Sequence, residues 1–202
     1  MAVVFSSEVS SANSSSMMGA LDDVISASSK ISSQINSFVT ESKEFLKGGG
    51  YDAVRNRLNV YSDAFKKQAQ LCSILTGNVK SANNTMLNYM EGYTKLNDSE
   101  LETIKTKLEN ANRMLTWLEE YSDIWVLDKE TKEKTKKKRR NGTDSQIESY
   151  STIIGELEKL VTKLEELSST DASAFGMISG CEGDVDSFYN CVDGLSTSTF
   201  SS

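Results

Sequence analysis

Apolar residues recur every three or four positions along two stretches of about forty residues, 9–47 and 51–93, which is the spacing of a coiled-coil seam. The chain has no proline, a residue that breaks helix interiors. We therefore predict two long helices, each burying a narrow stripe against a neighbour. The first stripe comprises Met17, Leu21, Val24, Ser28, Ile31, Ile35, Phe38, Ser42 and Phe45. The second comprises Val54, Leu58, Tyr61, Phe65, Gln68, Cys72, Leu75, Val79, Ala82, Met86, Tyr89 and Tyr93.

Three consecutive glycines, Gly48, Gly49 and Gly50, separate these stretches. A phosphate-binding loop would follow a strand and precede a Lys-Ser/Thr pair, whereas here a helix precedes and Tyr51-Asp52 follows. Glycine readily adopts the left-handed conformation that ends a helix, and Asp52 suits the dipole at the start of the next one. We therefore predict a turn that folds the two helices into an antiparallel hairpin, with a flexible linker as the alternative.

The remainder of the chain is also predicted to be helical, so the expected fold class is all-α. We expect a third helix from a cap at Asp98 or Ser99 to about residue 121. A fourth is expected from 143 to about 167, ended by a cap at 168–171. Their stripes are Leu101, Ile104, Leu108, Ala111, Leu115 and Leu118, then Ile147, Tyr150, Ile154, Leu157, Val161 and Leu164.

A weaker, glycine-dotted fifth helix is expected over 172–192, and residues 124–127 could be a helix end or a small strand. The predicted architecture is a long, coiled-coil-like antiparallel hairpin with additional C-terminal helices in an elongated bundle. We divide it into two domains. The hairpin occupies 1–95, and a C-terminal helical region with a basic loop at 128–142 occupies 96–202.

Charge is distributed unevenly along this acidic chain, whose net charge is -7. Residues 129–140 hold eight basic and two acidic residues, and the rest of the chain is strongly acidic. Such a run could bind nucleic acid, an anionic membrane or an import receptor. No aromatic residues are interleaved with it, so we favour a solvated loop and do not expect nucleic acid as a partner. A coiled-coil structural or nucleic-acid-binding adaptor that uses residues 134–140 is the alternative function.

The chain has no histidine, which removes the usual general base and the commonest transition-metal ligand. Neighbouring carboxylates on a helix point about 100° apart and do not form an acid–base pair; such pairs are Asp22-Asp23, Glu119-Glu120 and Glu165-Glu166. We therefore predict that the protein is not an enzyme, with no catalytic residues, no cofactor, no metal and no small-molecule substrate.

Three scattered cysteines, Cys72, Cys181 and Cys191, form neither a disulfide framework nor a zinc site. Cys181 and Cys191 could pair if the backbone turns between them, but on one continuous helix they would lie ~15 Å apart. The N-terminus lacks the basic region and long apolar core of a signal peptide. We therefore expect a chain that is cytosolic or exported without a cleavable leader.

The segment FLKGGGYDAVRNRLNVY, residues 45–61, resembles the helix-turn-helix signature of the WXG/LXG superfamily of type VII secretion substrates. In that family a Trp-x-Gly or Leu-x-Gly tripeptide closes a long helical hairpin, and Leu46-Lys47-Gly48 supplies the Leu-x-Gly form. Tyr51 followed by Asp52-Ala53-Val54-Arg55 resembles the next segment of many LXG proteins. The resemblance covers 1–95 and is architectural over 96–202. The turn lacks tryptophan, which favours the LXG type over a simple WXG homodimer.

The resemblance implies a helical secretion-targeting module that docks small helical WXG-like proteins and is presented to the type VII secretion ATPase. It implies a protein that is secreted or at the cell surface by a leaderless route and cytoplasmic before export. LXG modules usually target a bacterial toxin domain; none lies within these residues, so the chain is either part of a larger effector or a stand-alone substrate or partner. Homo- and hetero-oligomers both remain open.

Three sets of site residues follow. The turn motif is Leu46, Gly48, Gly49, Gly50 and Tyr51. The expected partner-binding seam is Phe38, Phe45, Leu58, Tyr61 and Phe65. Tyr189 and Asp193 match the Tyr-x-x-x-Asp/Glu export signal that the resemblance implies.

Overall fold

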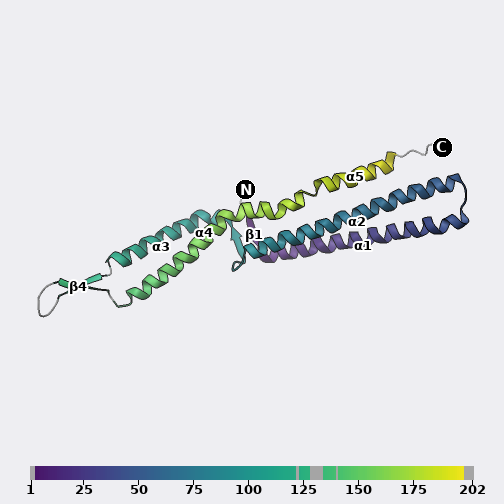
Figure 1. Ribbon diagram of the computed structural model, residues 1–202. Coiled ribbons are helices and arrows are strands. Elements are labelled where there is room, and N and C mark those ends of the chain that lie inside the picture. Colours follow the sequence, from purple (N-terminus) through teal and green to yellow (C-terminus); the bar gives the residue numbers. More distant parts are fainter. Residues whose placement is uncertain (1–2, 122, 128–133, 140, 198–202) are drawn as a thin grey trace. The chain divides into compact units, whose positions relative to one another are not determined.

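The computed structural model describes residues 3–121, 123–127, 134–139 and 141–197 (Figure 1). The fold is all-α, as predicted, with two short two-stranded ladders added. The chain forms two compact units. The hairpin unit contains Ser6–Thr94 and Thr170–Ser202, and the second unit contains Met1–Phe5 and Lys95–Ser169. This division differs from a boundary at residue 95, because the last part of the chain groups with the hairpin.

The hairpin unit is built on α1, Ser7–Phe45, and α2, Gly49–Tyr89 (Figure 1). Side-chain hydrogen bonds show that the two helices run antiparallel. Ser10 Oγ donates to Asn83 Oδ1 over 2.9 Å, far from the turn. Ser28 Oγ donates to Gln68 Oε1 over 3.0 Å, nearer to it. The predicted antiparallel hairpin is therefore confirmed.

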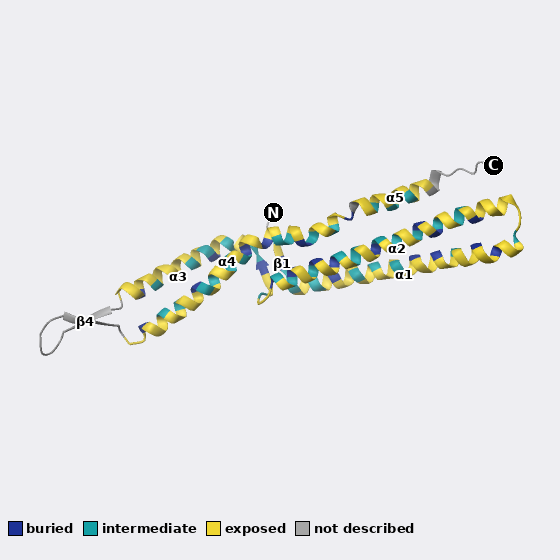
Figure 2. Cartoon of the chain, in the orientation of Figure 1, coloured by how far each residue is buried: buried dark blue, intermediate teal, exposed yellow. Residues whose placement is uncertain are grey.

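The face of α1 that contacts α2 is rich in serine. We call the set that repeats along this face the inner seam: Ser14, Met18, Leu21, Ile25, Ser28, Ser32, Ile35, Val39 and Ser42. Five of its members are buried, and four of these five are serines. Figure 2 shows buried positions recurring along α1. The hydroxyls of Ser32 and Ser62 lie 2.7 Å apart, and that of Ser62 also donates to Asn36 Oδ1 over 2.9 Å. These bonds offset the cost of burying the hydroxyls.

The stripe that we predicted to be buried on α1 is therefore wrong at every second position, where the residue is exposed. Ser28 and Ser42 are buried, and Leu21 and Ile35 are half-buried. The other five predicted members are exposed: Met17, Val24, Ile31, Phe38 and Phe45. On α2 the predicted Val54 is exposed, whereas Arg55 and Ser62 are buried. The physical reason is that small side chains let two helices approach closely, so serines occupy the contact and larger residues lie beside it.

A C-terminal segment packs on α2 within the hairpin unit. It consists of the last residues of α4, Thr143–Ser179, and of α5, Glu182–Thr197. Asn78 Nδ2 of α2 donates to the carbonyl oxygen of Met177 and to Cys181 Sγ, each over 3.1 Å. α2 is therefore bonded to the segment at the break between α4 and α5.

The predicted helix end at 168–171 is wrong, because α4 is continuous through it. The hydroxyl of Ser169 donates back to the carbonyl oxygen of Glu166 over 2.9 Å. A serine bonded in this way is accommodated inside a helix and does not cap a new one. The break comes later, where the amide of Cys181 bonds the carbonyl of Ile178 and its own carbonyl accepts from Val185.

The second unit pairs α3, Leu101–Tyr121, with residues 143–169 of α4. The predicted α3 stripe is confirmed, since Ile104, Ala111 and Leu118 are buried. Lys105 Nζ of α3 lies 2.9 Å from Glu165 Oε1 of α4, and this hydrogen bond raises the pKa of Lys105. Lys105 lies near the start of α3, and Glu165 lies near the end of residues 143–169 of α4. These two helices therefore also run antiparallel.

Two ladders and a short 3-10 turn complete this unit. β1, Val4–Ser6, pairs with β2, Lys95–Asn97, and a 3-10 helix follows at Asp98–Glu100. The cap of this 3-10 helix is Asn97, whose Oδ1 accepts from the amide of Ser99. The predicted caps of the third helix, Asp98 and Ser99, lie inside this 3-10 helix. β3, Asp123–Leu127, pairs antiparallel with β4, Lys134–Arg139. Residues 124–127 are thus the small strand.

Candidate protein-interaction surface

The turn between α1 and α2 needs glycine at one of its three glycine positions. Gly48 has φ 114, a conformation that L side chains rarely adopt, and it caps the start of α2. Gly49 and Gly50 lie in the first turn of α2. α1 ends instead with Leu46 extended, its amide bonded to the carbonyl of Ser42 over 2.8 Å. We expected a glycine in the left-handed conformation to end α1. Gly48 instead caps the start of α2.

Arg55 locks this turn, and we did not predict its role. Its buried guanidinium donates from Nη1 to the carbonyl oxygen of Leu46 over 2.8 Å, and from Nη2 to the Asp52 carboxylate. A weaker bond of 3.4 Å reaches the carbonyl of Ser42. A cation at these carbonyls also interacts favourably with the negative end of the α1 dipole. The available signal was Asp-x-x-Arg directly after the turn, a spacing that places the two side chains together on a helix.

The outer face of α1 carries a second set of repeating residues, which we call the outer seam. Its members, of which all but Phe45 come one position before an inner-seam residue, are Met17, Ala20, Val24, Ala27, Ile31, Gln34, Phe38, Glu41 and Phe45. All are exposed, and the five large apolar members recur every seven residues. From Met17 to Phe45 this seam extends about 42 Å along the helix.

The predicted partner-binding residues divide between two environments. Phe38 and Phe45 belong to the outer seam and are 48% and 80% exposed. Leu58, Tyr61 and Phe65 of α2 are half-buried. The structure therefore leaves the two phenylalanines free to contact another molecule and gives the α2 residues a share in the hairpin itself. Of the turn motif, Tyr51 is exposed and Leu46 is half-buried.

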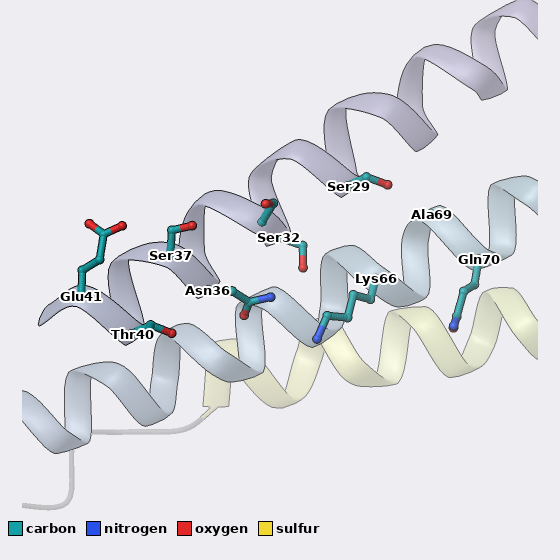
Figure 3. A pocket seen from close by; sticks show the side chains of 10 residues that line it. Ser29, Ser32, Asn36, Ser37, Thr40, Glu41, Lys66, Ala69 and Gln70 are labelled. Atoms are coloured by element: carbon teal, nitrogen blue, oxygen red, sulfur yellow. The ribbon is translucent and has the colours of Figure 1, made fainter. Parts of the chain in front are cut away.

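A polar groove of about 670 Å³ runs between α1 and α2 (Figure 3). Hydroxyl and amide side chains dominate its lining: Ser29, Ser32, Ser33, Asn36, Ser37, Thr40, Glu41, Lys66, Ala69 and Gln70. Lys66 Nζ is paired with Asp63 over 3.1 Å, and Ser32 is bonded to Ser62. Both of these side chains are therefore already bonded, and we interpret the groove as space that short side chains leave between the two helices.

The described residues hold no group of three or more His, Cys, Asp and Glu side chains that could bind a metal. The cysteines are free, so Cys181 and Cys191 are not paired. Burial raises the pKa of the Cys72 thiol, which makes it less reactive at neutral pH. Among the described helices, none has both the length and the apolar composition of a membrane span.

Tyr189 and Asp193 lie four residues apart on α5 and therefore share one face of that helix. Tyr189 is 61% exposed, and its ring centroid lies 5.9 Å from that of Phe188. Of the basic residues 134–140, all but Arg140 lie in β4, and residues 128–133 and 140 of the predicted loop lie outside the described residues.

Comparisons with known proteins found no relative of this chain. The chain matches no protein-family model, no curated protein and no solved structure. The functional argument therefore depends on the residues and their geometry.

Proposed function

We propose that the hairpin is a non-enzymatic docking module that binds small helical partner proteins through the outer seam of α1. In its full form, the proposal is that the chain is an LXG-like substrate of type VII secretion. Its WXG-like partners complete a helical bundle that the secretion ATPase recognises. The observation that carries the proposal is the exposure of five large apolar side chains at seven-residue spacing.

The seven-residue spacing specifies the kind of partner. Positions that repeat every seven residues stay on one side of a supercoiled helix over its whole length. A surface that meets all five must itself be long and straight, which describes an amphipathic helix laid along α1. Ala20 and Ala27 alternate with the larger residues, so the N-terminal half of the outer seam admits a close neighbour.

The lock at the turn supports the same proposal. Arg55 and Gly48 hold the end of α1, whose last residue is Phe45, against the start of α2. A binding face built on rigid elements loses less conformational entropy on association than a flexible one. The half-buried Tyr61 and Phe65 of α2 would extend the surface if the partner also reaches α2.

The export part of the proposal is supported by the resemblance of residues 45–61 to the LXG signature and by the exposed Tyr189. On this proposal, Tyr189 and Asp193 form the export signal, and the protein is secreted or at the cell surface. Where the partner docks and how the chain is exported are separate parts of the proposal.

The docking test is co-expression with candidate small helical proteins, such as any that are encoded next to this chain, followed by size-exclusion chromatography with light scattering. A stable complex that is lost in the double variant I31S/F38S supports the proposal. The matched control is V60S/I74S, which removes two similarly exposed apolar side chains from α2. A folded monomer that binds none of these proteins and is not exported would overturn it.

A further inference from the structure

We propose that the second unit binds the surface of an anionic lipid bilayer through the C-terminal end of α3 and the β3–β4 ladder. This site is separate from the outer seam and goes beyond the proposed docking function. Three observations carry it: exposed aromatic side chains, a strand of basic residues, and their proximity in one unit.

The aromatic part lies on α3. Met114, Trp117 and Tyr121 are spaced by three and four residues, so they share one face of the helix. Trp117 is 54% and Tyr121 67% exposed. Met114 and Trp117 also line a shallow depression of about 440 Å³. Tryptophan and tyrosine are enriched at membrane–water interfaces because their rings are apolar at one end and polar at the other.

The basic part is β4, whose sequence KTKKKR is basic at five of its six positions. Its partner β3 has the sequence DIWVL, and the register pairs Ile124 with Lys138, Trp125 with Lys137 and Val126 with Lys136. Every apolar residue of these three pairs therefore has a lysine directly across the ladder. A positive strand paired with an apolar strand combines attraction to anionic lipid headgroups with residues that can enter the interface.

The two parts lie at the same end of the unit. α3 ends at Tyr121 and β3 begins at Asp123, so these Cα atoms are at most ~7.6 Å apart. The rest of the chain is acidic and would be repelled by an anionic surface, which favours an approach with this end first.

A bilayer fits these observations better than nucleic acid does. Single-stranded nucleic acid is bound by aromatic rings that stack on successive bases beside a basic groove. Here the strand across the ladder from the lysines carries aliphatic residues, namely Ile124, Val126 and Leu127. They offer no stacking surface to bases, but they can be buried among acyl chains.

The test is flotation of the full chain with vesicles of phosphatidylcholine alone or of phosphatidylcholine mixed with phosphatidylglycerol. We expect binding to the anionic vesicles alone, and its loss at high salt because the attraction is screened. Replacing Lys136, Lys137 and Lys138 by serine should weaken it on the order of a hundredfold, at about fivefold per lysine. The control K67S/K80S/K107S removes the same charge from three exposed positions elsewhere and should bind normally.

The aromatic contribution has its own readout. In the W125F variant Trp117 is the remaining tryptophan, and we expect its fluorescence to shift to shorter wavelength with anionic vesicles. W117S/Y121S should weaken vesicle binding on the order of tenfold, whereas F38S/F45S should leave it unchanged. The latter pair tests the docking function, so failure of one proposal is distinguishable from failure of the other.

Three results would overturn the proposal: no flotation with anionic vesicles, equal flotation with neutral ones, or retention of binding in the triple lysine variant. Tighter binding of a single-stranded oligonucleotide than of vesicles, lost in both the lysine and the aromatic variants, would assign the site to nucleic acid. Circular dichroism of each variant checks that it is folded.

Discussion

α1 and α2 are similar in length and both carry a seven-residue repeat, but they differ in how many sides are covered. α2 packs against α1 on one side, and its Leu75 and Asn78 lie against the C-terminal segment. α1 packs against α2, and its outer seam is exposed. The comparison shows that a repeat of apolar residues does not have to be buried within the chain. It also separates residues that stabilise the fold from residues that are available for binding.

The largest effect on stability is expected at a buried position of α2. Met86 is fully buried, and replacing it by alanine leaves a cavity, so we expect a loss of about 3 kcal/mol in the free energy of unfolding. Urea denaturation followed by circular dichroism measures it. The control is M17A in α1, an exposed methionine for which we expect a change within about 0.5 kcal/mol. Equal losses in both variants would contradict the distinction between the two helices.

The next effect is at the turn that joins them. R55A removes the donor to the carbonyl of Leu46 and the partner of Asp52, and we expect a loss of about 2 kcal/mol. K67A removes an exposed lysine further along α2, and it is a control for loss of positive charge in that helix. If R55A unfolds at the same urea concentration as the wild type, Arg55 does not lock the turn.

A smaller effect at the same turn distinguishes its glycines. G48A places a side chain at φ 114, and we expect a loss of about 1 to 2 kcal/mol. G49A lies in the first turn of α2 with nothing near its Cβ, so we expect no loss and a gain of up to about 1 kcal/mol. The same urea titration compares them. A more damaging G49A would mean that the chain reverses at a different residue.

How far the fold could be predicted is clearest on α1. A spacing of three and four residues between apolar positions predicts the helix. A stripe shifted by one position round the helix has the same spacing, so the spacing does not show which stripe is buried. We chose the more hydrophobic stripe, with Ile31 and Phe38. The hairpin buries Ser32 and Val39 instead, and the hydrogen bond from Ser32 to Ser62 depends on α2 being close. That information lies in the packing of two helices and not in the composition of one.

The site shows the same limit. Gly48 is recognisable from sequence because a turn was needed and glycine permits it, but the role of Arg55 requires knowing that its side chain returns to the end of α1. The ladder of β3 with β4 was left open because DIWVL is short enough to be a helix end. Phe38 and Phe45 are exposed because the hairpin buries the neighbouring stripe of α1, and this could be seen only in the structure.

The smallest expected effect on stability is the one that tests the function. F38S removes a large apolar side chain from the outer seam, and because this side chain is about half exposed we expect the free energy of unfolding to change by about 0.5 kcal/mol or less. If a partner helix covers Phe38, the same change should weaken the complex at least tenfold, since a buried aromatic is among the costliest residues to lose at an interface. Isothermal titration calorimetry with the purified partner measures this loss.

The control is V39A, one position along, for which we expect the opposite pattern. Val39 is buried, so we expect its replacement to cost about 2 kcal/mol in the free energy of unfolding and to leave partner affinity nearly unchanged. If F38S instead destabilises the isolated chain as much as V39A does, the outer seam belongs to the core of the protein, and the contrast between α1 and α2 is lost.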